Sequence, residues 1–168
     1  RPLWVPLVSI LGACASPPPA VTLEDMADAL AEVDIVILGE IHDNDTCHVQ
    51  QLQILQLLYA RRPDLVLSME MFERDVQPAL DEYLAGRIPE REFRTKARAW
   101  HNYETGYRPL IELAKARKIP VVASNAPAML RRKVGFGGKS VLDGLPEQQR
   151  AWLSKELGRP MDLWPGSC

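Results

Sequence analysis

Short apolar runs alternate with helical patterns along this 168-residue chain. Residues 34–38, 65–69 and 119–125 are rich in apolar, mostly aliphatic residues, and each run gives way to polar side chains, which predicts three strands. Apolar positions recur at helical spacing over residues 44–60, 75–86 and 110–117. The order β-α-β-α-α-β predicts an α/β fold, in which flanking helices join the strands of a parallel sheet through right-handed crossovers.

Further elements are expected around this core. Thr22 is a candidate cap for a helix over residues 23–31, and residues 89–96 predict a short, strongly charged helix. Asp75 is the expected cap of the helix that Gly86 ends. Towards the end of the chain, residues 135–138 predict a flexible turn, and residues 146–157 predict an amphipathic helix capped near Asp143.

Residues 1–20 have the pattern of a targeting segment followed by a tether. Residues 3–13 are apolar apart from Ser9, and this stretch is too short to span a bilayer but suits a signal peptide. The run Leu11-Gly12-Ala13-Cys14 resembles a bacterial lipobox, and a proline-rich stretch follows it. We therefore expect a signal-peptide remnant with lipidation at Cys14, and a single α/β domain over residues 21–168. The alternative is a disordered arm with a chance cysteine.

Ionisable side chains gather where the first two predicted strands end. Glu40, His42 and His48 follow the first strand, and Glu70 follows the second. Ligands of open α/β sheets bind outside the carboxyl ends of the strands, so we expect these groups to share one edge. A helix N-terminus favours a neutral imidazole at His48, for which a capping or core-edge role is the alternative. Arg74 is a candidate for pairing with Glu70, for holding an anionic ligand, or for a plain surface salt bridge.

Residues 100–109 combine aromatic, polar and glycine residues in a pattern typical of a binding loop. His101, Tyr103 and Tyr107 are residue types that ligate haem iron, and Arg98 or Arg108 could hold a propionate. The alternative is an aromatic lead-in to the next helix that packs beneath its neighbours.

Charge is unevenly distributed, although the net charge is only -2. Residues 21–85 hold 14 acidic and 3 basic side chains, whereas residues 86–139 hold 13 basic and 4 acidic ones, with a basic cluster at Arg131, Arg132 and Lys133. One interpretation is two solvated faces of opposite sign, and the other is a positive surface for a phosphate or a haem propionate. Nucleic acid is not an expected partner, because the whole chain is slightly acidic.

Five short runs form a recognisable set when they are taken together. They are residues 38–44 (LGEIHDN), Glu70-Met71-Phe72, Gln77, residues 100–107 and Asn125-Ala126-Pro127. In order and spacing this set resembles the ChaN-like haem-binding lipoproteins of the Tiki/TraB-type superfamily, over residues 33–133. The resemblance implies an α/β fold and a haem cofactor, bound between the two subunits of a homodimer. Family members are longer, so we expect a C-terminally truncated chain with an incomplete sheet.

The resemblance also implies a role in haem or iron uptake, at the bacterial cell envelope. We expect a lipid-anchored protein of the outer membrane that faces the periplasm. The candidate haem-binding residues are His42, His48, His101, Tyr103, Tyr107, Arg74 and Arg108. The alternative is a metal-dependent hydrolase, in which Glu40, His42 and Glu70 hold a divalent metal or activate water directly. A third interpretation is a periplasmic scaffold with a vestigial site.

Overall fold

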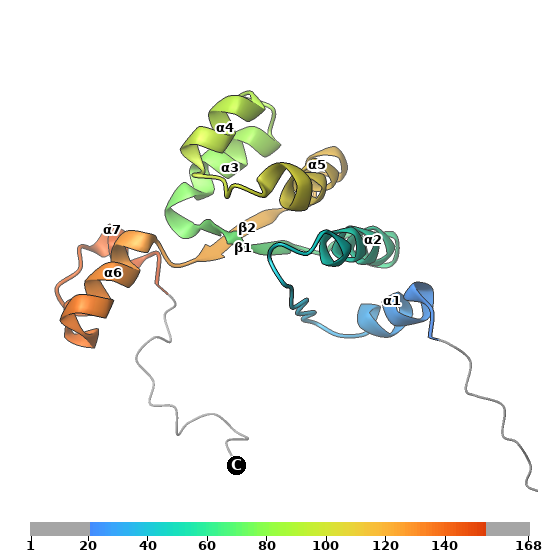
Figure 1. The fold of residues 1–168 in the computed structure, drawn as a ribbon, viewed down its shortest axis with the longest axis horizontal. Helices are drawn as coiled ribbons and strands as arrows, with labels where there is room; N and C mark the ends of the chain where they lie inside the picture. The colour runs from blue at the N-terminus through green and yellow to red at the C-terminus, as the bar shows by residue number, and fades with distance from the viewer. Residues whose placement is uncertain (1–20, 154–168) are drawn as a thin grey trace, which may run out of the picture.

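A computed structural model describes residues 21–153, so the predictions for residues 1–20, Cys14 included, lie outside the described residues. The helices are α1 (Leu23–Ala31), α2 (Asp45–Arg61), α3 (Gln77–Leu84), α4 (Glu90–Lys96), α5 (Arg108–Arg117), α6 (Ala128–Gly137) and α7 (Glu147–Arg150). The strands are β1 (Leu67–Glu73) and β2 (Val121–Asn125), and the short turns are η1 (Arg74–Val76), η2 (Tyr103–Tyr107) and η3 (Lys139–Leu142). Figure 1 shows α6 and α7 at one end of the molecule, and α1 and α2 towards the other.

The two strands pair in parallel, with Leu67 opposite Val121 and Met69 opposite Ala123. The chain between them forms α3, α4 and α5, because a parallel pair cannot be closed by a tight turn. The predicted α/β fold with a parallel sheet is therefore confirmed, although each of these strands begins two residues later than the sequence pattern indicates.

The first predicted strand does not form, and this part of the prediction is wrong. Residues 33–39, named here the apolar segment, contain neither helix nor strand, and Ile35 and Ile37 are 78% and 88% exposed. Among the described residues β1 pairs only with β2, so the sheet has two strands and one edge of β1 is open. Strand propensity reflects packing against neighbouring strands, and a β-branched run without such neighbours gains little from the strand conformation.

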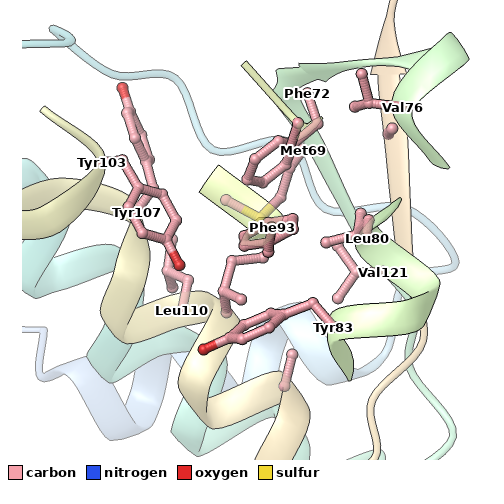
Figure 2. Close-up of a cluster of buried hydrophobic side chains, with 14 of the residues drawn as sticks. Met69, Phe72, Val76, Leu80, Tyr83, Phe93, Tyr103, Tyr107, Leu110 and Val121 are labelled. Carbon is pink, nitrogen blue, oxygen red and sulfur yellow. The ribbon is translucent and has the colours of Figure 1, made fainter. Parts of the chain in front are cut away.

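The hydrophobic core lies between the strands and the helices that connect them. Met69, Val121 and Ala123 are buried on the inner side of the sheet, at alternate strand positions. Phe93 of α4 is completely buried at the centre of the cluster, and its ring stacks on that of Tyr83 with a centroid distance of 4.5 Å (Figure 2). This core holds η2 and α5 in fixed positions, and the site described below depends on them.

Side chains cap the starts of α1 and α2, and the cap expected at Thr22 is confirmed. The Thr22 hydroxyl accepts the backbone N–H of Asp25 at 3.1 Å, and the Asp25 carboxylate accepts the backbone N–H of Thr22 at 2.9 Å, which completes a capping box for α1. Asn44 caps α2 through its side-chain oxygen. Asp75 is not the cap of α3, because it lies within η1 and accepts a hydrogen bond from Arg98 at 2.6 Å.

The chain after β2 is more helical than its glycines suggest. Helix α6 includes Gly135 and Gly137 of the predicted turn, and its C-cap is Gly138, whose φ of 70° favours glycine. Burial of Leu130 holds the inner face of α6 against the domain, so packing overrides the weak local propensity. The helix predicted over residues 146–157 is shorter in the described chain, where α7 begins after Pro146 rather than near Asp143.

Candidate functional site

The apolar segment leads into a buried carboxylate, Glu40, whose side chain is only 7% exposed. Its Oε1 accepts hydrogen bonds from the Tyr107 hydroxyl at 2.6 Å and from Nδ1 of His42 at 2.7 Å, and its Oε2 accepts one from Nε2 of Gln51 at 2.6 Å. Burial opposes the charge, but these hydrogen bonds outweigh burial and hold the pKa of Glu40 below its ordinary value. These four residues and His48 are named the Glu40 cluster.

His42 is the exposed member of the Glu40 cluster, with half of its side chain open to solvent. Nδ1 donates to Glu40, the ring meets Trp100 edge to face at 5.1 Å, and Nε2 has no hydrogen-bond partner among the described residues. The hydrogen bond to Glu40 raises the pKa of His42 above its ordinary value. The result is an imidazole oriented by a carboxylate, with one ring nitrogen free to bind a metal or a proton.

His48 fixes the backbone of His42. Its buried ring donates from Nε2 to the His42 carbonyl at 2.8 Å, and Nδ2 of Asn102 donates to the same oxygen at 2.7 Å. Gly106 lies close against this ring, since a Cβ there would come within 2.9 Å of Cδ2 and Nε2 of His48. His48 therefore occupies the core-edge position that the sequence left open as an alternative.

A cavity of about 900 Å³ lies beside the Glu40 cluster. It is bounded by β1 and the residues before it, by α2 and by the apolar segment. Glu40, His42 and Glu70 all line it, so the structure brings together the three residues that the sequence places at one edge. Much of the remaining lining is apolar, for example Leu58 and Leu110. Concave apolar sites with a few polar groups are the usual form of ligand pockets.

Tyr103 and Tyr107 lie in the core, with 1% and 0% of each residue exposed. The binding-loop interpretation is wrong for these two residues, and the alternative of a packed lead-in to α5 is the one observed. Residues 100–107 are named here the aromatic segment, and its two tyrosines pack among α2, α4 and α5. Burial raises the pKa of both hydroxyls above the ordinary value. The Tyr107 hydroxyl is bound to Glu40, and the Tyr103 hydroxyl has no hydrogen-bond partner in residues 21–153.

The other predicted haem-binding residues do not line the cavity. Arg108 forms a bidentate ion pair with Glu90 at 2.6 and 3.1 Å, and Arg74 donates to a backbone carbonyl at 2.9 Å. His101 is 85% exposed on the surface. In the part of the chain that the structure describes, Arg62 is the one arginine or lysine that lines the cavity.

The predicted metal site is not formed by the described residues. Glu70 reaches the cavity from β1, but residues 21–153 contain no group of three or more His, Cys, Asp or Glu side chains that could hold a metal ion. Both oxygens of Glu40 are already engaged by hydrogen-bond donors. The metal-dependent form of the hydrolase alternative therefore has no support among residues 21–153.

The sequence did not predict the roles of four residues of the site. Gln51 lies three residues after His48, so helical spacing could have placed both on one face of α2. Asn102 and Gly106 belong to the predicted binding loop, but their roles depend on contacts with residues far away in the sequence, which no local signal predicts. Arg62 lies just after the helix predicted over residues 44–60, where no pattern marks it as a binding residue.

Comparison with models of protein families tests the family resemblance independently of the structure. The model of the family described as "Haem-binding uptake, Tiki superfamily, ChaN" matches residues 26–162. The matched range includes the Glu40 cluster and every residue named above as lining the cavity. Comparison with curated proteins and with solved structures finds no match to the chain.

Proposed function

Because the chain belongs to the ChaN family of haem-binding uptake proteins in the Tiki superfamily, we propose that it binds haem in the cavity beside the Glu40 cluster, with His42 as the axial ligand. The observation that carries this assignment is that Glu40 holds the His42 imidazole through Nδ1, while Nε2 has no partner within residues 21–153. Haem iron accepts an axial histidine, and a carboxylate on the other ring nitrogen fixes the tautomer and raises the basicity of the ligand.

The cavity fits the rest of the haem group. Its apolar lining suits a porphyrin, and Arg62 supplies a cation for a propionate in addition to its ion pair with the exposed Asp64 at 3.3 Å and its hydrogen bond to the Ala31 carbonyl at 3.0 Å. The tyrosines are weaker candidates, because a tyrosine binds iron as tyrosinate and burial raises the pKa of both hydroxyls. Bound haem would supply a redox-active iron. The chain would supply the ligand to that iron, the apolar walls of the pocket and the cation that pairs with a propionate.

Titration of ferric haem into the full chain tests the proposal. We expect saturable binding with a sharp Soret band, and His42→Ala should weaken binding and shift that band, with recovery when free imidazole is added. His101→Ala is the matched control, since this histidine is exposed and does not line the cavity. Retention of the wild-type spectrum by His42→Ala would remove the ligand assignment, and absence of saturable binding by the wild type would remove the haem proposal.

Two further variants separate the possible ligands. Glu40→Gln should lower haem affinity by about 10–100-fold, because it removes the charged partner of the ligating imidazole. Replacing Tyr103 and Tyr107 together by Phe should leave the position of the Soret band unchanged. A shifted band in the double variant would transfer the ligand role to a tyrosine.

We also propose that Cys14 carries a lipid and anchors the protein in the outer membrane, facing the periplasm. The support is the lipobox-like run in the sequence, together with membership of an uptake family. None of the described helices is long and apolar enough to span a bilayer. Metabolic labelling with a fatty acid should mark the wild type and not Cys14→Ala.

Haem binding between two subunits predicts a dimer in sedimentation experiments when haem is present.

A further inference from the structure

The outward face of α6 has an unusual composition for a surface helix. The buried Leu130 and the half-buried Val134 mark the side that packs on the domain. Met129, Arg132 and Phe136 recur at intervals of three and four residues, so they fall on the opposite side. Phe136 is 93% exposed, more than any other large hydrophobic residue of the described chain, and Met129 is also exposed.

The same region is cationic. From Ala126 to Leu142 the sequence holds Arg131, Arg132, Lys133 and Lys139 and no acidic residue. Arg131 is engaged by hydrogen bonds to side chains at the ends of β1 and β2. Arg132 and Lys139 have no ion-pair partner among residues 21–153, and the one hydrogen bond of Lys133, to α7, is 3.4 Å long. These cations are therefore available to an anionic partner.

The geometry points to a binding surface for an anionic lipid bilayer here, formed by Met129, Arg132 and Phe136 of the outward face with the exposed Lys133 at its flank, and named the α6 patch. Surfaces that lie on a membrane combine cations, which are attracted to anionic lipids, with aromatic and aliphatic side chains, which enter the boundary between headgroups and acyl chains, and the exposed side of α6 offers both kinds of group. The cations lie against the lipid phosphates. A free phosphate ion would gain nothing from contact with Phe136, and a neutral surface would not attract the cations. The two features together therefore favour an anionic bilayer.

The α6 patch is separate from the haem cavity, because no residue of α6 lines that cavity. In Figure 1, α6 lies at one end of the molecule, away from α2 and the apolar segment. The contact therefore holds the domain on the membrane without covering the cavity, and it does not depend on the haem proposal.

Vesicle sedimentation with the full chain tests this surface. All proteins carry Cys14→Ser so that no lipid at that position contributes. We expect binding to vesicles of phosphatidylcholine and phosphatidylglycerol, and little binding to phosphatidylcholine alone. Arg132→Gln with Lys133→Gln should weaken binding by roughly five-fold for each cation removed. Phe136→Ser should weaken it several-fold, with thermal unfolding unchanged because this side chain is exposed.

Matched controls remove similar groups elsewhere. Arg87→Gln with Arg91→Gln takes two exposed cations from the α3–α4 region, and Val49→Ser takes an exposed apolar side chain from α2, so both should bind like the parent protein. Equal binding to both vesicle types, or no binding to either, overturns the proposal. Loss of binding in the presence of millimolar inorganic phosphate at constant ionic strength, or full binding by Phe136→Ser, also overturns it, because the ligand is then a phosphate group and not a bilayer.

Discussion

In the aromatic segment Tyr103 and Tyr107 are almost inaccessible to solvent, whereas in the apolar segment Ile35 and Ile37 are among the most exposed large hydrophobic side chains of the described chain. The sequence pattern predicts the reverse, namely a strand of the sheet for the apolar segment and a binding loop for the aromatic segment. The two segments differ in what surrounds them. The aromatic segment lies among apolar faces of α2, α4 and α5, while the apolar segment has one open strand edge beside it. Whether a run is buried thus depends on its available partners as well as on its own hydrophobicity.

The largest expected difference in the free energy of unfolding is between substitutions in these two segments. Tyr103→Ala should lower the free energy of unfolding by about 3–5 kcal/mol, the range for removing a large aromatic side chain from a core. Ile37→Ser should change it by less than about 0.5 kcal/mol, as exposed substitutions do. Urea unfolding of both variants measures the two values. A loss of more than about 2 kcal/mol in Ile37→Ser would show that the apolar segment is buried in solution, and the comparison would fail.

The sequence predicted the elements whose signals are local. The cap at Thr22, the helix of α2 and the parallel relation of the two strands follow from capping residues, helical spacing and the order of elements. Glu40, His42 and Glu70 line one cavity, as the sequence suggests, but not as residues at strand ends, because the first strand does not form and Glu70 lies within β1. The hydrogen bond from Tyr107 to Glu40 could not be predicted, because it joins residues 67 positions apart through tertiary packing.

The hydrogen bond between Tyr107 and Glu40 joins the aromatic segment to the residue that follows the apolar segment. Tyr107→Phe removes one donor from a buried carboxylate, and hydrogen bonds to charged groups contribute about 1.5–3 kcal/mol, so a loss of this size is expected. Tyr103→Phe is the matched control, because it removes a hydroxyl without a partner in the described chain. The control should be as stable as the wild type or more so. Equal losses in the two variants would mean that the hydroxyls, rather than the bond to Glu40, matter for packing.

Close packing of Gly106 on His48 is the next feature to test. Gly106→Ala places a Cβ within 2.9 Å of the imidazole, and overpacking of this kind costs about 1–3 kcal/mol. Gly135→Ala is the control, since nothing lies within 4 Å of its Cβ position and the helix gains an alanine. Combining Gly106→Ala with His48→Ala should cost less than the sum of the two single changes, because the second removes the ring that the first displaces. Additive losses would show that the clash is relieved elsewhere.

The smallest expected effect is the pH dependence that Glu40 contributes. Its pKa is lowered from 4.5 in the folded protein, so the unfolded chain binds its proton more tightly. The stabilisation is therefore present above the unfolded pKa and is lost as the pH falls through the lower, folded pKa. Urea unfolding of wild type and Glu40→Gln between about pH 5.5 and pH 3 should give a steeper decline for the wild type. Other carboxylates titrate in both proteins and cancel in the difference, and Tyr107→Phe should give an intermediate slope because it removes one of the hydrogen bonds that lower this pKa. Parallel declines of the free energy of unfolding in all three proteins would mean that the buried carboxylate is no better stabilised in the folded protein than in the unfolded chain. The hydrogen bond between Tyr107 and Glu40 would then contribute nothing to the pH dependence of stability.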